Sequence, residues 1–186
     1  MKIRLASDIQ TDSIVDGEGL RTVIWTQGCS HNCEGCHNPK THSFDGGFLV
    51  DTEDVKKEIA ELKYQDGVTL SGGDPFFQAD AVLDIAEFCQ SKGLNVWCYT
   101  GFTFEKLLEM SKNNYTILEL LNNIDVLVDG KFVLNLKSYD CKFRGSTNQR
   151  LINVKESLKF GKVVNYELKE DKKLTELLKP RKALYV

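Results

Sequence analysis

Short, mostly apolar segments alternate along this chain with longer segments whose apolar residues recur every three or four positions. The short segments are rich in β-branched and aromatic residues, which is typical of strands covered on both faces. The clearest predicted strands are residues 22–26, 68–70, 94–99 and 124–128. Because strand-then-helix units favour right-handed crossovers and a parallel sheet, this alternation predicts an α/β fold.

The segments between the strands carry the start and stop residues of helices. Asp51 or Thr52 can cap the first helix, and Thr103 opens the third. Gly93 stops the second helix and Pro180 stops the last. The apolar residues at helical spacing are Val55, Ile59 and Leu62 in the first helix, Val82, Ile85, Ala86 and Cys89 in the second, Ile117, Leu118, Leu120 and Leu121 in the fourth, and Leu174, Leu177 and Leu178 in the last.

The length of the chain limits the α/β architecture that it can form. A complete eight-unit barrel takes about 250 residues, so 186 residues have room for about five or six strand–helix units. We therefore expect an incomplete, laterally open (β/α) barrel. On pattern alone a doubly wound sheet is the alternative. Since the chain contains no Pro/Gly-rich linker and no internal repeat, we expect one domain over residues 1–186.

Composition and charge exclude several classes of protein. The 41% hydrophobic and 27% charged residues are typical of a soluble globular chain rather than a disordered one. A formal net charge of −3 argues against a nucleic-acid partner, because binding a duplex requires a basic surface. No segment approaches the ~20 apolar residues that cross a bilayer, and the N-terminus lacks the apolar stretch of a signal peptide. We therefore expect a cytoplasmic protein with no membrane partner.

Charge is unevenly distributed along the chain. Residues 155–186 contain nine Lys and Arg against five Asp and Glu, a net charge of +4 that leaves −7 on residues 1–154. We expect this basic segment to form a solvated face of the protein. A docking surface is the alternative interpretation.

Three of the six cysteines lie close together, directly after the first predicted strand. Cys29, Cys33 and Cys36 follow a C-x3-C-x2-C pattern, at the strand end where α/β folds build their active sites. Thiols stay free in a reducing cytoplasm, and soft thiolates suit an iron–sulfur cluster or zinc. Because a [4Fe-4S] cluster normally takes four cysteines, three ligands would leave one iron open to an outside ligand.

Zinc binding and unrelated thiols are the alternatives for this cysteine segment. His31 or His37 would complete a Cys3His zinc site, but structural zinc sites usually draw two pairs of ligands and no second pair follows here. The other three cysteines are scattered singly. Cys89 lies on an apolar helix face and Cys98 lies within a strand, so we expect both to be small core residues.

The three clustered cysteines match the signature of the radical S-adenosylmethionine (SAM) enzymes. Gly35 departs from that signature, because most members carry an aromatic residue at this position. The stretch from residues 16–21 (Asp-Gly-Glu-Gly-Leu-Arg) through residues 36–39 (Cys-His-Asn-Pro) resembles a narrower family, the activating proteins of anaerobic ribonucleoside-triphosphate reductases. The resemblance implies a radical SAM core over about residues 8–155, followed by a basic extension over residues 156–186.

The resemblance also implies two cofactors and the residues that bind them. Cys29, Cys33 and Cys36 would hold one [4Fe-4S] cluster, whose fourth iron chelates SAM. Residues 71–75 (Ser-Gly-Gly-Asp-Pro) resemble the Gly-Gly-Glu segment of the superfamily, which binds the amino group of SAM. Without the resemblance, these residues indicate a glycine turn with Asp74 as a helix N-cap. The residues expected to contact SAM are Gly35, Cys36, His37, Gly72, Gly73, Asp74, Ser146 and Asn148.

Three further segments resemble the same activating proteins, although a plain loop or turn would also explain each of them. These segments are residues 99–102, 128–132 and 144–150. In the last of them, Ser146 and Asn148 are candidates to bond the adenosine of SAM. Arg144 is a candidate to contact a carboxylate or the protein partner.

The implied reaction activates another enzyme, and no catalytic side chain is expected beyond the cluster and SAM. An external one-electron donor such as flavodoxin reduces the cluster, and cleavage of SAM gives a 5′-deoxyadenosyl radical. This radical removes hydrogen from a backbone glycine of the reductase, so the protein partner is an anaerobic ribonucleoside-triphosphate reductase. The alternatives are a small radical SAM enzyme similar to pyruvate formate-lyase activase or 7-carboxy-7-deazaguanine synthase, and a zinc-binding module.

Overall fold

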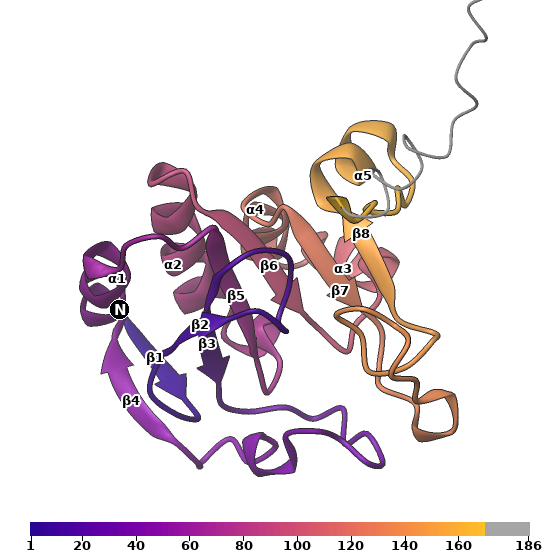
Figure 1. The fold of residues 1–186 in the computed structure, drawn as a ribbon, viewed down its shortest axis with the longest axis horizontal. Coiled ribbons are helices and arrows are strands. Elements are labelled where there is room, and N and C mark those ends of the chain that lie inside the picture. The colour runs from indigo at the N-terminus through magenta and orange to yellow at the C-terminus, as the bar shows by residue number, and fades with distance from the viewer. Residues whose placement is uncertain (170–186) are drawn as a thin grey trace, which may run out of the picture.

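The computed structural model describes residues 1–169, which form one eight-stranded sheet with helices packed on one of its faces (Figure 1). The strands are β1 (Lys2–Leu5), β2 (Gln10–Ser13), β3 (Arg21–Thr26), β4 (Phe48–Asp51), β5 (Gly67–Gly72), β6 (Asn95–Tyr99), β7 (Val126–Asp129) and β8 (Arg150–Asn153). Their order is β4-β1-β3-β5-β6-β7-β8, and β2 pairs with β3. The central strands β3, β5, β6 and β7 are parallel, whereas the other pairings are antiparallel.

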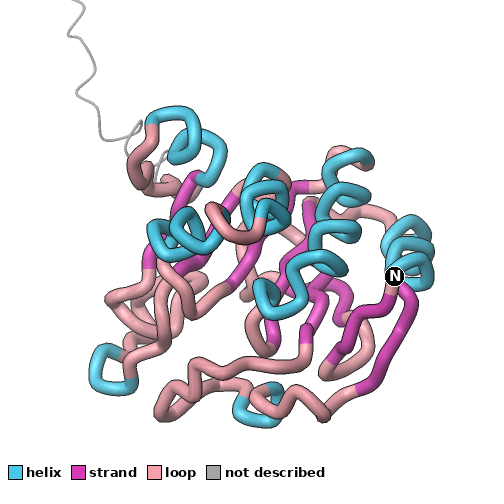
Figure 2. The backbone as a smooth tube through the Cα atoms, turned by 180° about the vertical axis from the view of Figure 1, so that it is seen from behind, coloured by secondary structure: helices cyan, strands magenta, loops and turns pink. Residues whose placement is uncertain are grey.

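The helices of the described residues lie together on one side of the sheet, as the view from behind in Figure 2 shows. They are α1 (Thr52–Glu61), α2 (Ala79–Ser91), α3 (Phe104–Ser111), α4 (Tyr115–Asn122) and α5 (Val154–Phe160), with short 3-10 turns η1 (Pro39–Thr41), η2 (Pro75–Gln78) and η3 (Leu134–Leu136). The main apolar core lies between these helices and the sheet. A doubly wound sheet would carry helices on both faces, so the one-sided arrangement favours the open, partial barrel.

The predicted α/β fold with a laterally open barrel is therefore confirmed, but the parallel part is smaller than five or six units. It contains four parallel strands, β3, β5, β6 and β7. The N-terminal strands reach β3 through short connections that contain no helix, so they pair antiparallel instead of adding parallel units. At the other edge, β8 also pairs antiparallel with β7. Short antiparallel strands thus flank a parallel centre.

The predicted helix ends and core cysteines agree with the structure. Asp51 is the N-cap of α1 and accepts a hydrogen bond from the Glu53 amide, and Thr103 caps α3 in the same way. Cys89 and Cys98 are both fully buried. The predicted last helix and most of the basic extension fall within residues 170–186, outside the described residues. Among residues 1–169, no helix combines the length and the apolar character that crossing a membrane requires.

Arg21 is a buried charge at the start of β3, and the segment before it packs around this side chain. Arg21 is 1% exposed, and its guanidinium donates to the Thr69 hydroxyl (2.6 Å) and to the Val68 carbonyl (2.6 Å). It also lies over the Trp97 ring, 5.4 Å from the ring centroid, and burial lowers the pKa of Arg21 to about 10. A Cβ on Gly17 would lie 2.8 Å from the Arg21 side chain. Residues 17–21 therefore pack together at the start of β3, around the buried Arg21 side chain.

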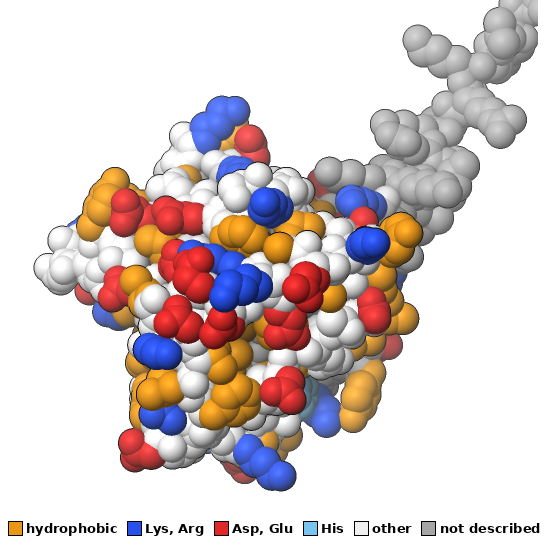
Figure 3. Space-filling view, turned by 90° about the vertical axis from the view of Figure 1, so that its left-hand side faces the viewer, with side chains coloured by type: hydrophobic (Ala, Val, Ile, Leu, Met, Phe, Trp, Pro, Cys, Tyr) orange, Lys and Arg blue, Asp and Glu red, His pale blue; other side chains and the backbone are white. Residues whose placement is uncertain are grey.

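Charged side chains of both signs cover the face beside α1 and β4, where Figure 3 shows them interspersed. Lys56 pairs there with Glu53 and Asp84, and Lys57 pairs with Asp54. The Lys57–Asp54 pair is exposed on both sides and contributes little to stability, because water screens it. This face is consistent with a solvated surface rather than a basic binding surface.

A more enclosed ion-pair network joins β7, β8 and α3. Arg150 donates to both carboxylate oxygens of Asp129, which is 1% exposed, and also to Glu105 at 3.0 and 2.8 Å. The hydrogen bonds from Arg150 lower the pKa of Glu105 from 4.5 to about 2. Asp129 also accepts a hydrogen bond from the Phe104 amide at the start of α3 (2.8 Å). The network therefore fixes the antiparallel edge strand to the barrel.

Replacing Glu105 with Gln is expected to remove part of the acid sensitivity of the fold. Because the folded-state pKa lies below the ordinary value, the stabilisation is present at neutral pH and is lost as the pH falls from about 4.5 toward about 2. Glu105 is 59% exposed, so we expect a loss of less than about 1 kcal/mol at pH 7. The free energy of unfolding, measured by chemical denaturation against pH, should show the two proteins converging in acid.

Glu58→Gln, at an exposed position of α1, is the matched control for the change in charge. It should leave the pH dependence of stability close to that of the unsubstituted protein. If the free energies of unfolding of Glu105→Gln and the parent differ by a constant amount down to acid pH, the ion pair between Glu105 and Arg150 does not cause the pH dependence.

Candidate functional site

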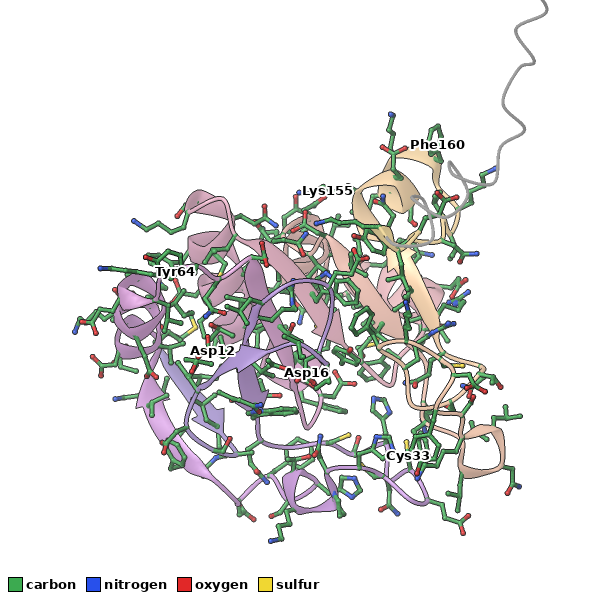
Figure 4. The ribbon with its side chains drawn as sticks, viewed as in Figure 1. Asp12, Asp16, Cys33, Tyr64, Lys155 and Phe160 are labelled. Atoms are coloured by element: carbon green, nitrogen blue, oxygen red, sulfur yellow. The ribbon has the colours of Figure 1, made fainter. Side chains whose placement is uncertain are left out.

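The loops that follow the four parallel strands meet at one end of the sheet. The cysteine loop follows β3, which ends at Thr26, and the Gly-Gly-Asp segment continues from β5, which ends at Gly72. Residues 100–103 follow β6, and residues 130–134 follow β7. Figure 4 shows Cys33 beyond this end of the sheet, beside the loops from the later strands. The tertiary structure thus gathers segments that are about a hundred residues apart in sequence.

The Gly-Gly-Asp segment packs backbone against backbone on the start of the cysteine loop. The Gly73 amide donates to the Thr26 carbonyl (2.7 Å), and the Asp74 amide donates to the Gly28 carbonyl (3.0 Å). A Cβ on Gly73 would lie 2.4 Å from the Gly28 oxygen, and Gly72 adopts φ +105°. Only residues without side chains permit this approach. The two glycines therefore place Asp74 directly beside the cysteine loop.

The Asp74 carboxylate collects hydrogen bonds from several of these loops. It is 1% exposed, and its Oδ2 accepts from His31 Nε2 (2.6 Å), Thr100 Oγ1 (2.9 Å) and the Gly101 amide (2.9 Å). Its Oδ1 accepts from the Phe76 amide (3.0 Å), which makes Asp74 the N-cap of η2, as the residues alone indicated. The same carboxylate therefore caps a helical turn and connects the loops after β3, β5 and β6.

The three clustered cysteines are free thiols, each partly exposed. The Asn38 amide donates to the Cys36 sulfur (3.4 Å), and hydrogen bonds of this kind tune cluster sulfurs. Burial raises the pKa of Cys29 to about 11 and also raises the pKa of Cys33. These thiols are protonated at neutral pH without metal, so iron binding must release their protons.

The donor set of this loop fits an iron–sulfur cluster. Three soft sulfur donors on one short loop are the ligands such a cluster takes. Within residues 1–169, no three or more His, Cys, Asp or Glu side chains are close enough to hold a single metal ion. A four-iron cluster is wider than one ion, so its thiolates do not have to converge on one point. His31, one of two candidate fourth ligands for zinc, instead directs its Nε2 to Asp74.

Gly35 adopts a left-handed conformation (φ +70°) and is exposed beside the loop that follows β7. A Cβ at this position would lie 2.8 Å from Leu134 Cδ1 and 3.4 Å from the Phe132 ring. The Phe132 ring also contacts the His37 ring, at 4.9 Å between centroids. The left-handed φ favours glycine at position 35, and the side chains of residues 132–134 lie beside it.

Residues 144–150 lie beside the loop that follows β7. Two polar side chains of this segment differ in burial and in hydrogen bonding. Ser146 is fully buried, and its hydroxyl accepts a hydrogen bond from the Val133 amide (3.2 Å). Asn148 is exposed and donates to the Lys131 carbonyl (2.9 Å). The structure thus brings both residues to the predicted end of the sheet, where the contact of either one with SAM stays a prediction.

This chain matches a known protein family and is similar to several known proteins. Residues 15–152 match the family described as a 4Fe-4S single cluster domain. The anaerobic ribonucleoside-triphosphate reductase-activating protein of Salmonella typhi is 37% identical over 145 residues, which are 73% of this chain and 90% of that protein. Those of Haemophilus influenzae and Enterobacteria phage T4 are 36% and 34% identical, over 73% and 74% of this chain and 89% and 86% of theirs. The chain belongs to this family of activating proteins.

Membership of the family confirms the resemblance inferred from residues 16–39. The protein is a radical SAM activase of the glycyl-radical type, and a [4Fe-4S] cluster and SAM are its cofactors. The family match covers residues 15–152, and the bounds of the expected core, about residues 8–155, stay a prediction. The zinc-binding module is thereby set aside in favour of the cluster.

His31 is the residue of this site whose position the residue pattern did not indicate. The sequence suggested it only as a zinc ligand, whereas its ring lies 4.5 Å from the Phe102 ring and bonds Asp74. The sequence does show that His31 and Asp74 each follow the end of a strand. Their contact could not be predicted from this, because it depends on β3 and β5 being neighbours in the sheet.

Gly73→Ala is expected to displace the cysteine loop, because the added Cβ would meet the Gly28 carbonyl at 2.4 Å. The backbone segments at positions 28 and 73 are both held in place, so neither can move away from the added Cβ. We therefore expect a loss of about 2 kcal/mol or more in the free energy of unfolding. Iron uptake during anaerobic reconstitution should fall as well. Thermal unfolding and iron content per chain measure the two effects.

Gly93→Ala is the control, because a Cβ there meets nothing within 4 Å. Its positive φ of +74° costs about 1–2 kcal/mol, and iron uptake should remain normal. Full iron uptake by Gly73→Ala would show that the close backbone contact does not shape the cluster loop.

Proposed function

We propose that this activating protein generates a glycyl radical on an anaerobic ribonucleoside-triphosphate reductase, with Cys29, Cys33 and Cys36 as its only protein ligands to the cluster. The observation that carries the proposal is the packing of the cysteine loop on the Gly-Gly-Asp segment at the ends of the parallel strands. When bound, the cluster and SAM supply the one-electron chemistry that removes hydrogen from a glycine. The protein supplies the binding surface and the orientation.

The SAM side of the site is proposed to lie between the cysteine loop and the Gly-Gly-Asp segment. Its expected contacts are Gly35, Cys36 and His37 from the first segment and Gly72, Gly73 and Asp74 from the second. The buried Asp74 carboxylate places negative charge where a cationic ligand carries its ammonium and sulfonium groups, and low exposure strengthens that attraction. Since Asp74 Oδ2 already accepts three hydrogen bonds, Asp74 attracts the ligand mainly through its charge.

On the adenosine side, the two predicted residues take different roles. Asn148 is exposed and presents its amide at the surface of the loop. Ser146 is buried and acts by holding the backbone of Val133, which keeps residues 132–134 against the cysteine loop. Arg144 donates to the Gln149 carbonyl (3.2 Å) and so contributes to the shape of this segment.

We propose that the whole chain acts as one radical SAM domain. The described part of the extension packs on the core, because the Tyr166 hydroxyl donates to Glu18 (2.7 Å) and Leu168 is buried. The reaction is placed in the cytoplasm with an external donor such as flavodoxin, because free thiols and low-potential electrons both require a reducing compartment. The open side of the barrel suits a protein substrate, whose loop must enter from the side.

Electron paramagnetic resonance tests the choice of substrate. The reconstituted, reduced protein is mixed with SAM and with either anaerobic ribonucleoside-triphosphate reductase or pyruvate formate-lyase. We expect a glycyl radical signal on the reductase and none on the lyase. A signal on the lyase alone would overturn the proposal in favour of the related activase.

Cys33→Ala is expected to abolish both stable cluster binding and SAM cleavage, because two thiolates cannot hold the cluster in place. Cys89→Ala should cost about 1 kcal/mol of stability and leave the iron content unchanged, because Cys89 is fully buried in α2 and away from the loop. Iron content and cleavage of SAM by the reduced protein measure the contrast. Equal losses in the two variants would contradict the ligand assignment.

A further inference from the structure

His31 lies in the cysteine loop between two cluster ligands, yet its ring is enclosed by protein. The side chain is 7% exposed, and its Nε2 lies 2.6 Å from Asp74 Oδ2. The ring meets Phe102 edge-on, with centroids 4.5 Å apart, and lies 5.7 Å from the Phe77 ring. Aromatic rings from two other loops therefore hold the imidazole in one orientation.

The backbone after β6 is shaped to receive this ring. A Cβ on Gly101 would lie 2.3 Å from His31 Cδ2, so any side chain at position 101 would displace the imidazole. The Gly101 amide donates to the same Asp74 oxygen that His31 contacts (2.9 Å). The Thr100 hydroxyl donates to that oxygen as well (2.9 Å). Three donors from two loops thus converge on a single buried oxygen atom.

We infer that His31 is a positioning residue that fixes the cysteine loop relative to Asp74, and hence the cluster ligands relative to SAM. The inference rests on the proposed function, which assigns Cys29 and Cys33 to the cluster and Asp74 to the SAM side. His31 is two residues from each of these cysteines, so a fixed imidazole fixes the loop that carries both thiols. In this inference His31 acts through Asp74 and not by contact with the substrate.

Removing His31 has a defined physical cost. Asp74 is 1% exposed, so water cannot readily replace a lost donor, and a buried carboxylate with fewer partners is destabilised. Hydrogen bonds to an ionised carboxylate are also stronger than neutral ones. Without the imidazole, the loop between Cys29 and Cys33 loses its side-chain attachment to the segment after β5.

The first test uses the metal-free full-length chain and measures amide hydrogen exchange of residues 29–36. His31→Leu removes the donor and should raise exchange in this loop about tenfold, whereas His31→Gln keeps an amide donor and should restore most of the protection. His42→Leu, which removes a histidine just outside the loop, should leave the exchange unchanged. Equal protection in His31→Leu and the unsubstituted chain would overturn the inference.

The second test uses the reconstituted protein and follows the change that SAM causes in the paramagnetic resonance spectrum of the reduced cluster. His31→Leu should bind SAM about tenfold more weakly, with His31→Gln closer to the parent. Adding His31→Leu to Asp74→Asn should cost little more than Asp74→Asn alone, because coupled residues are not additive. Full additivity, or no rescue by Gln, would overturn the inference.

The two tests separate this inference from the proposed function. If the unsubstituted protein takes up no iron or shows no response to SAM, the proposed function fails. The exchange measurement still decides whether His31 holds the loop, because it needs neither metal nor SAM. If His31→Leu does not fold, the same comparison is made with His31→Gln and Thr100→Val, which removes a different donor to the same Asp74 oxygen.

Discussion

The close backbone contact between residues 26–28 and residues 72–74 is the constraint on which the site depends. Two amide-to-carbonyl hydrogen bonds join these segments, and the glycines leave no room for a side chain between them. Because β3 and β5 are adjacent and parallel, their following loops leave the sheet at the same end. A segment that carries three thiols thereby lies next to one that carries a buried carboxylate. The proposed site for the cluster and SAM rests on that proximity.

The sheet supports this end in two ways. Its four parallel strands place successive loops side by side, while short antiparallel strands flank them at both edges. The helices cover one face (Figures 1 and 2), and a second apolar cluster that contains Trp97, Val126 and Val128 lies on the other face. At the opposite end of the strands, the buried Arg21 links β3 to β5. The sheet and its buried core therefore lie behind the loops that we propose to bind the cofactors.

Gly35 in the cysteine loop lies beside side chains from the loop that follows β7. Most radical SAM enzymes carry an aromatic side chain at this position, whereas here Phe132 and Leu134 from the loop after β7 lie against it. Ser146 holds the backbone of that loop through the Val133 amide. The segments over residues 130–134 and 144–150 therefore contribute to the cluster loop from outside it. In this structure these segments pack on the cysteine loop, and their contact with SAM stays a prediction.

The sequence by itself determined the α/β class, the caps at Asp51 and Thr103, the burial of Cys89 and the family, because these depend on local spacing and short motifs. Periodicity did not reveal the antiparallel edge strands, which are short and pair through long-range register. Only the tertiary structure decided that His31 contacts Asp74, 43 residues away, and that Leu134 lies beside Gly35. Such contacts depend on which strands are neighbours, and hydrogen bonding along the sheet sets that order.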